Sequence, residues 1–185
     1  MRGVVEQQAG RRVALSLFEV LIVLVIIGIL SVLLLPAISA LRARAQRVQC
    51  MANLRSLYLA ANLYVQQNGS WPQIAMGDTD SAEEDYANAW ISALVPFGPN
   101  QKTWICPTVQ NLLGNPDLSD SQNVRVDYGA MSFDDKPTTP YQWPQAPWFA
   151  ESQNVHGNGN LIIFTDGSIS DVYTVAAKAS PAPTP

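Results

Sequence analysis

The stretch from Leu15 to Leu41 is a long apolar run, and it constrains the fold more than any other part of the sequence. Between Val20 and Leu35 every residue is apolar except Gly28 and Ser31. The run therefore reaches the roughly 20 residues that a helix needs to cross a bilayer. We predict one transmembrane helix here, preceded by a basic leader over residues 1–14.

One carboxylate, Glu19, lies near the start of this run. A charged side chain at the centre of a bilayer costs about 2.5–3.5 kcal/mol on insertion scales. Glu19 therefore needs either a shallow position near the lipid head groups or a positively charged partner. The two alternatives imply different functions. A shallow position needs no other protein, whereas a positively charged partner on another molecule would make Glu19 an intermolecular contact.

Charge is divided unevenly along the chain. Residues 1–47 hold six arginines against Glu6 and Glu19, whereas residues 48–185 hold five basic and thirteen acidic side chains, a net charge of −8. Binding to a nucleic-acid backbone requires a basic surface. The second part of the chain therefore shows no sign of a nucleic-acid partner.

The residues after the membrane run continue the helical pattern. No helix breaker intervenes until Asn68-Gly69, so we predict a single helix from Leu15 to about Gln67. Apolar residues recur at alternating steps of four and three: Cys50, Leu54, Leu57, Ala61 and Tyr64. The polar residues Arg47, Asn53, Arg55, Asn62 and Gln66 are predicted to lie largely off this stripe. The stripe should pack the helix onto a soluble domain.

The segment Ala14-Leu15-Ser16-Leu17-Phe18-Glu19 resembles the leader motif of type IV prepilins and type II secretion pseudopilins. In that family a membrane aspartyl peptidase, the prepilin peptidase, cuts after the small residue and methylates the new amino terminus. The resemblance implies cleavage between Ala14 and Leu15, with Leu15 N-methylated, and a pairing of Glu19 with the amine of a neighbouring subunit. The chain departs from the family at Ala14, where glycine is strongly preferred, and this departure bears on processing efficiency.

An ordinary secretory signal is the rival interpretation of the same stretch. Arg11-Arg12 would be its basic region, and Ala37-Ile38-Ser39-Ala40 would offer small residues for cleavage. The apolar run is longer than the usual 7–15 residues of such a signal, and a signal gives no reason for Glu19. We therefore favour the prepilin interpretation.

The C-terminal part contains a second motif. His156 is followed after nine residues by Asp166-Gly167, a spacing that resembles the H-X9-DG element of prepilin-type proteins. The pattern predicts a strand over residues 161–165, a tight turn at Asp166-Gly167 and a returning strand over residues 168–175. His156 could act as a base or metal ligand with Asp166, but a role in the turn or in packing is favoured, since it is the only histidine.

The middle of the chain carries weaker signals. We predict a helix over residues 81–94, a short strand at Trp104-Ile105-Cys106 closed by Pro107, and a strand over residues 124–129. Four prolines and several aromatic residues predict an extended surface loop over residues 134–148. Its aromatic side chains could cover the sheet or bind a ligand.

Two cysteines, Cys50 and Cys106, lack metal-ligand spacing. They could form a disulfide outside the cytoplasm, or Cys50 could be a small buried apolar residue. Calcium is a second chemical option, since some major pseudopilins bind it near the C-terminus. The acidic candidates are Asp127, Asp134 and Asp135, but they lack EF-hand spacing. No metal, cofactor or catalytic residue is predicted.

Together these features predict an α+β fold, in which a long N-terminal helix with a transmembrane first half packs on a small antiparallel β-sheet, as in pilins. The expected parts are a leader (1–14), a membrane part (15–41) and a soluble part (42–67) of one helix, a globular domain (68–176) and a disordered tail (177–185). The chain contains no P-loop, so an enzyme is the least supported class.

The resemblance implies a structural subunit of a type II secretion pseudopilus, anchored in the inner membrane with its C-terminal domain in the periplasm. Its partners would be the prepilin peptidase, other pseudopilin subunits, inner membrane lipid and the secretion machinery. The alternatives are a type IV pilin for adhesion, motility or DNA uptake, and a membrane-anchored extracytoplasmic binding module.

Overall fold

The fold is taken from a computed structural model, which describes residues 17–74, 82–114, 124–157 and 159–179. The chain divides into two compact units, residues 1–41 and residues 42–185. Each unit is described by itself below. The predicted cleavage site at Ala14 and Leu15 lies outside the described residues.

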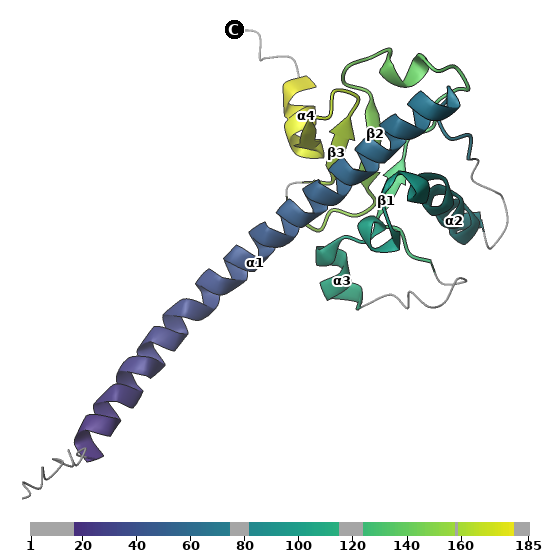
Figure 1. Cartoon of the computed structure of the whole chain (residues 1–185). Helices are drawn as coiled ribbons and strands as arrows, with labels where there is room; N and C mark the ends of the chain where they lie inside the picture. The colour runs from purple at the N-terminus through teal and green to yellow at the C-terminus, as the bar shows by residue number, and fades with distance from the viewer. Residues whose placement is uncertain (1–16, 75–81, 115–123, 158, 180–185) are drawn as a thin grey trace, which may run out of the picture. The chain divides into compact units, whose positions relative to one another are not determined.

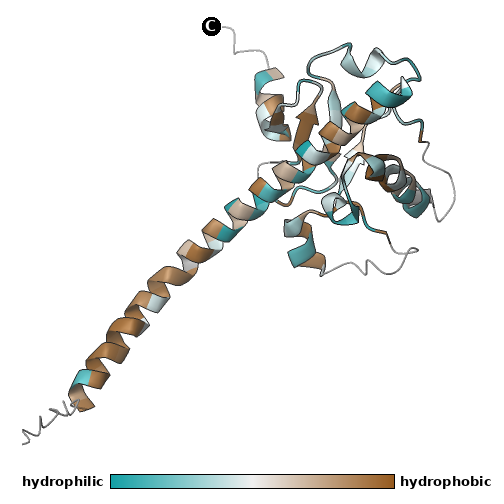
Figure 2. Cartoon of the chain, viewed as in Figure 1, coloured by the Kyte–Doolittle hydropathy of each residue, from teal (hydrophilic) through white to brown (hydrophobic). Residues whose placement is uncertain are grey.

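Helix α1, Leu17–Asn68, is 52 residues long and, as predicted, continuous, although it contains Pro36. It ends at Gly69, whose φ of +75° suits glycine and whose N–H donates to the Val65 carbonyl oxygen at 2.9 Å. Figure 2 shows that the first half of α1 is almost uniformly hydrophobic. Within the described part of the chain, α1 is the one helix long and apolar enough to span a membrane.

The second half of α1 contributes the predicted stripe to the core. Cys50, Leu54, Leu57 and Ala61 are fully buried, and Tyr64 packs against the same cluster. The prediction for Asn53 is wrong, because this side chain is buried. Its amide donates to the Ile105 carbonyl oxygen at 3.0 Å, and this bond satisfies a polar group inside the core.

The sheet has four strands in the order β1-β2-β3-β4, and every neighbouring pair is antiparallel (Figure 1). The strands are β1 (Tyr128–Ala130), β2 (Pro147–Glu151), β3 (Leu161–Phe164) and β4 (Ile169–Asp171). The α1 stripe and the buried faces of β2 and β3 belong to one hydrophobic core. The predicted α+β class with a long helix on a small antiparallel sheet is thereby confirmed.

Aromatic rings fill the centre of this core. Trp71 is fully buried, and its ring centroid lies 4.9 Å from that of Trp148, 5.0 Å from that of Phe133 and 5.8 Å from that of Trp90. Such edge and tilted contacts add to the free energy gained by burying the rings. Trp71 therefore links the chain after α1, helix α2 and strand β2.

The helix predicted over residues 81–94 is confirmed as α2, Ala82–Leu94, which is followed by the 3-10 turn η1, Val95–Phe97. The strand predicted at Trp104-Ile105-Cys106 is wrong. Asn100 and Thr103 bond each other's backbone N–H groups in a capping box, so residues 101–104 form the 3-10 turn η2, Gln101–Trp104. Pro107 does not close a strand but begins helix α3, Pro107–Leu113, where its missing N–H costs nothing.

The strand predicted over residues 124–129 is only partly correct, since β1 begins at Tyr128. The predicted loop over residues 134–148 contains the 3-10 turn η3, Thr139–Tyr141, and the start of β2. Trp148 is fully buried and donates its indole N–H to the Pro140 carbonyl oxygen at 2.9 Å. The loop therefore covers the core with Trp148, as one alternative expected, whereas Trp143 stays exposed.

The C-terminal hairpin forms as predicted up to Asp171, but the returning strand does not continue to residue 175. Helix α4, Val172–Ala179, begins instead. The Asp171 carboxylate accepts the Thr174 backbone N–H at 2.9 Å, which caps the first turn of this helix. The predicted tail is therefore helical as far as Ala179, and the rest of it lies outside the described residues.

Replacing Asp171 by alanine should lower the free energy of unfolding by about 1–2 kcal/mol, since it removes both the helix cap and an ion pair with Arg47. The Arg47 guanidinium lies 3.3 Å from the Asp171 carboxylate. Asp171→Asn keeps a capping oxygen and removes only the charge, so it should cost less. Urea unfolding of both variants measures the two losses, and equal losses would show that the cap contributes nothing.

Candidate functional site

The first unit carries an uninterrupted apolar surface. Every side chain from residue 17 to residue 35 is exposed, including Glu19 near the start of α1. An exposed apolar surface of this extent is not stable in water and marks a contact with lipid or with other helices. Residues 17–41 can therefore span a membrane. Within this segment Glu19 is the one carboxylate.

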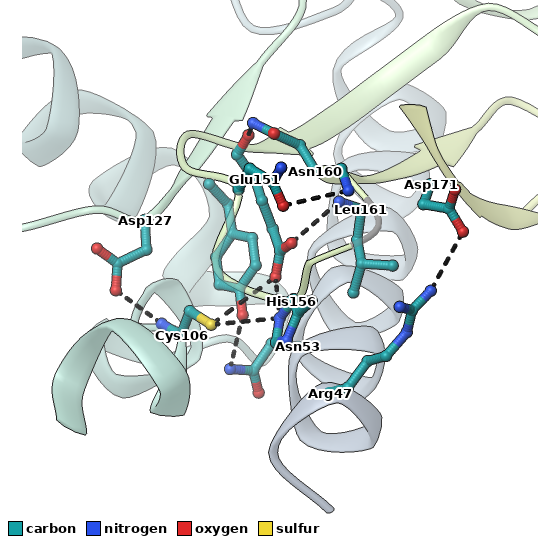
Figure 3. Close-up of polar contacts among 12 residues, drawn as sticks. Arg47, Asn53, Cys106, Asp127, Glu151, His156, Asn160, Leu161 and Asp171 are labelled. Carbon is teal, nitrogen blue, oxygen red and sulfur yellow. Dashed lines mark hydrogen bonds and ion pairs between the residues drawn. The ribbon is translucent and has the colours of Figure 1, made fainter. Parts of the chain in front are cut away.

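The second unit carries a buried cluster of four polar side chains from four separate segments. Cys50 comes from α1, Cys106 directly precedes α3, Glu151 ends β2, and His156 lies in the connection from β2 to β3. One sulfur, nitrogen or oxygen atom from each residue lies within 4.8 Å of every other. Figure 3 shows Cys106, Glu151 and His156 pointing toward one another.

The distances within the cluster are short. His156 Nε2 lies 3.0 Å from Glu151 Oε1, and the Cys106 sulfur lies 3.7 Å from the same oxygen and 3.8 Å from His156 Nε2. The side chains of His156 and Glu151 are only 4% and 2% exposed. Burial of these groups is costly unless each finds a partner, so their mutual contacts hold the site together.

Surrounding backbone groups orient the cluster. Glu151 Oε2 accepts the Leu161 N–H at 2.9 Å, and the Asn160 side-chain amide donates to the Glu151 carbonyl oxygen at 2.6 Å. The Cys106 N–H donates to Asp127 Oδ2 at 2.8 Å, and Asp127 also pairs with Arg125 at 3.2 Å. Glu151 and Cys106 are thus fixed from outside the cluster as well as within it.

The two thiols do not titrate alike. The hydrogen bond from Cys50 lowers the pKa of Cys106 to about 6, and backbone N–H groups of the following helix turn act in the same direction. The same bond and the burial of Cys50 raise the pKa of that thiol. The backbone N–H groups at the start of α3 therefore favour the thiolate form of Cys106.

A cavity of about 350 Å³ lies beside the cluster and is lined by residues of α1, Thr108, Val155 and His156. Arg44 and Arg47 contribute to its wall. Of the four cluster residues, His156 is the one that lines this cavity.

The structure brings some predicted site residues together and separates others. Cys50 and Cys106 are close to each other, but both are buried free thiols and are not joined. His156 contacts Glu151 and not Asp166, whose carboxylate accepts the Ser168 N–H in the turn at 2.8 Å. Gly167 has a φ of +76°, which explains the glycine at this turn position.

The calcium candidates do not form a shared site in the structure. Asp127 is buried and bonded to Arg125 and the Cys106 backbone, while Asp134 is exposed and accepts the Lys136 N–H at 3.1 Å. Among the described residues, the group of at least three metal-ligating side chains is Cys50, Cys106, Glu151 and His156.

Sequence reasoning missed Glu151 entirely. The sequence gives one indication of its place. Glu151 directly follows the apolar residues Trp148-Phe149-Ala150, as expected for an acidic residue at the end of a buried strand. Cys106 and Glu151 are 45 residues apart in the sequence, so no local spacing motif marks them and only the fold brings them together.

Comparison with known proteins adds nothing to this geometry. No protein-family model matches the chain, and no curated protein or solved structure matches it. The resemblance to pseudopilins therefore rests on the motifs at residues 14–19 and 156–167 and on the physical properties of α1.

Proposed function

We propose that this chain is a pseudopilin-like structural subunit that is anchored in a membrane by residues 15–41 and assembles into a filament through that apolar helix. The observation that carries the proposal is the continuous helix α1, whose first half is exposed and apolar and whose second half is built into a compact α+β unit. A helix of this kind can exchange lipid contacts for contacts with identical helices without unfolding the second unit.

Glu19 gives such an assembly a fixed register. Cleavage after Ala14 would create a cationic amine at Leu15, and the carboxylate of one subunit would pair with the amine of the next. Each charge is costly in an apolar medium, and pairing them removes much of that cost. The pair would thus favour one stagger between neighbouring helices.

The proposed role is mechanical, with no catalytic step. The subunit would lie in the inner membrane with its acidic second unit in the periplasm, would be processed by the prepilin peptidase, and would extend a pseudopilus for type II protein secretion. Energy for extracting the helix from lipid would come from the secretion machinery. A type IV pilin would share every step up to the formation of a surface fibre, which electron microscopy of whole cells would reveal.

A binding module is the second candidate, because the segment from Asp134 to Trp143 encloses an open hollow of about 680 Å³. Tyr141 and Trp143, both partly exposed, line it together with Lys136. Aromatic rings on an open surface suit a carbohydrate or a peptide. This candidate predicts ligand binding by an unassembled, unprocessed chain.

Intact mass and N-terminal sequencing of the protein from its own membranes test the proposal. We expect a mature chain that starts at methylated Leu15. Ala14→Gly should raise the processed fraction, because the peptidase family prefers glycine before the cut. A mature start near Leu41 would indicate a secretory signal, and an uncut Met1 would indicate a plain anchor; either result would contradict the proposal.

A further inference from the structure

We propose that the second unit binds one zinc ion through Cys50 Sγ, Cys106 Sγ, a carboxylate oxygen of Glu151 and His156 Nε2. The four donor atoms lie within 4.8 Å of one another and come from four different segments of the fold. This site does not depend on the proposed function, because none of its ligands belongs to the leader or to the apolar half of α1.

Three of the six separations between donors are close to those of a tetrahedral site, and the three that involve Cys50 Sγ are at most 4.8 Å. With Zn–S bonds of about 2.3 Å and Zn–N and Zn–O bonds of about 2.0 Å, neighbouring ligand atoms lie about 3.3–3.8 Å apart. The corresponding distances from the Cys106 sulfur are 3.7 Å to Glu151 Oε1 and 3.8 Å to His156 Nε2, and the Glu151–His156 distance is 3.0 Å. Binding an ion would require Glu151 Oε1 and His156 Nε2 to move slightly apart, because their separation of 3.0 Å is below this range.

The donor set selects the class of metal. Two thiolates favour zinc over magnesium or calcium, which prefer oxygen ligands. An imidazole and a carboxylate complete the four ligands. Zinc accepts this mixed set because its filled d shell imposes no other geometry, and structural zinc sites are almost always tetrahedral. All four positions are filled by protein atoms, so the site would be structural and would leave no coordination position for a substrate.

A zinc ion also explains why two thiols and a carboxylate are buried at the same place. A disulfide would use the two sulfurs alone and would leave Glu151 and His156 as a separate buried pair. Zinc engages all four groups: each thiol releases its proton to solvent, and the resulting thiolates and the carboxylate share the charge of the ion. The two positive charges of the ion thereby compensate two of the three negative charges of its ligands.

The surroundings supply what ligands of a metal need. The Leu161 N–H holds the second oxygen of Glu151, and the Asp127 carboxylate anchors the backbone at Cys106. Such outer contacts fix the orientation of ligands before the ion arrives. The cavity beside His156 carries Arg44 and Arg47 in its wall, so the excess of acidic side chains in the unit as a whole, rather than the cavity, favours the approach of a cation.

The ion would tie the second half of α1 to the sheet. Cys50 lies on α1 and Glu151 on β2, so the metal would add a link between α1 and the sheet to the apolar contacts of the core and the ion pair between Arg47 and Asp171. Binding restricted to the folded state stabilises that state. Removal of the metal with a chelator should therefore lower the thermal midpoint, by at least about 5 °C for a unit of this size.

Cobalt binding to the full-length chain tests the proposal. The protein is purified in detergent, reduced and handled without oxygen, and then titrated with Co²⁺. We expect one equivalent to bind with thiolate-to-cobalt charge-transfer absorption in the near ultraviolet and the intense visible bands of a tetrahedral ion. One equivalent of Zn²⁺ should remove both signals.

Matched variants assign the ligands. Cys50→Ser and Cys106→Ser should each weaken the charge-transfer absorption, and His156→Gln should lower the affinity at least tenfold. Asp166→Asn and Glu84→Gln are the controls, since both carboxylates are exposed and lie outside the cluster. Both controls should bind Co²⁺ as the natural chain does.

Two results would overturn the proposal. The first is a reduced natural chain that gives no thiolate charge-transfer absorption at several equivalents of Co²⁺. The second is a protein, purified without reductant, in which Cys50 and Cys106 are joined by a disulfide in every molecule. Both results come from the natural chain, so a variant that fails to fold cannot obscure either of them.

Discussion

Glu19→Ala should abolish filament assembly and leave insertion of the chain in the membrane intact. Without the carboxylate, the amine at the start of each mature helix has no partner in the apolar bundle. Breaking a buried ion pair by removing one partner costs about 3–5 kcal/mol, which would act at every subunit contact. The apolar run itself is unchanged, so anchoring should persist. Electron microscopy of filaments and fractionation of membranes measure the two effects separately.

Two further variants make the Glu19 result specific. Glu19→Gln keeps the size and hydrogen-bonding capacity of the side chain and removes the charge, so it should also fail to assemble. Glu84→Ala removes an exposed carboxylate from α2 and should assemble normally. If Glu19→Ala forms filaments of normal length and number, the charge pair does not determine the stagger between neighbouring helices.

Trp71→Ala should lower the free energy of unfolding of the second unit by about 3–5 kcal/mol, the usual cost of removing a large buried aromatic side chain. The Trp71 ring is fully buried and contacts Trp90, Phe133 and Trp148. Its loss leaves a cavity between the chain after α1, helix α2 and the sheet. Urea unfolding of the full-length chain, followed by circular dichroism, measures the loss.

Trp143→Ala is the matched control for this prediction. Trp143 is 56% exposed, and substitutions at such positions usually change the free energy of unfolding by less than about 0.5 kcal/mol. The comparison keeps the residue type constant and varies only its burial. Similar losses from the two variants would show that the aromatic cluster around Trp71 does not hold the unit together.

The long helix and the C-terminal hairpin could be predicted because their signals are local. The apolar run, the stripe from Cys50 to Tyr64 and the Asp166-Gly167 turn each depend on residues close together in sequence. The stripe lies in the core and the turn joins β3 to β4, as expected. Periodicity and turn chemistry act over a few residues, so a single sequence is enough to find them.

The wrong strand predictions lie where a local hydrogen bond from side chain to backbone outweighs an apolar sequence pattern. The capping box at Asn100 and Thr103 stabilises a 3-10 turn where apolar residues predicted a strand. The Asp171 carboxylate caps a helix where alternating apolar residues predicted a strand. Both arrangements use polar side chains to satisfy nearby backbone N–H groups. The buried cluster was missed for another reason, since Cys50, Cys106 and Glu151 meet only after the tertiary fold has formed.

The pairing of the second half of α1 with the last hairpin determines when this protein can fold. The Tyr58 hydroxyl on α1 donates to the Thr165 carbonyl oxygen at 2.9 Å, across a separation of 107 residues. Contacts of such high sequence separation form late and slowly. During synthesis the core between α1, β2 and β3 can thus be completed only after residues 161–165 have been made, and the apolar surface that stays exposed until then is prone to aggregate.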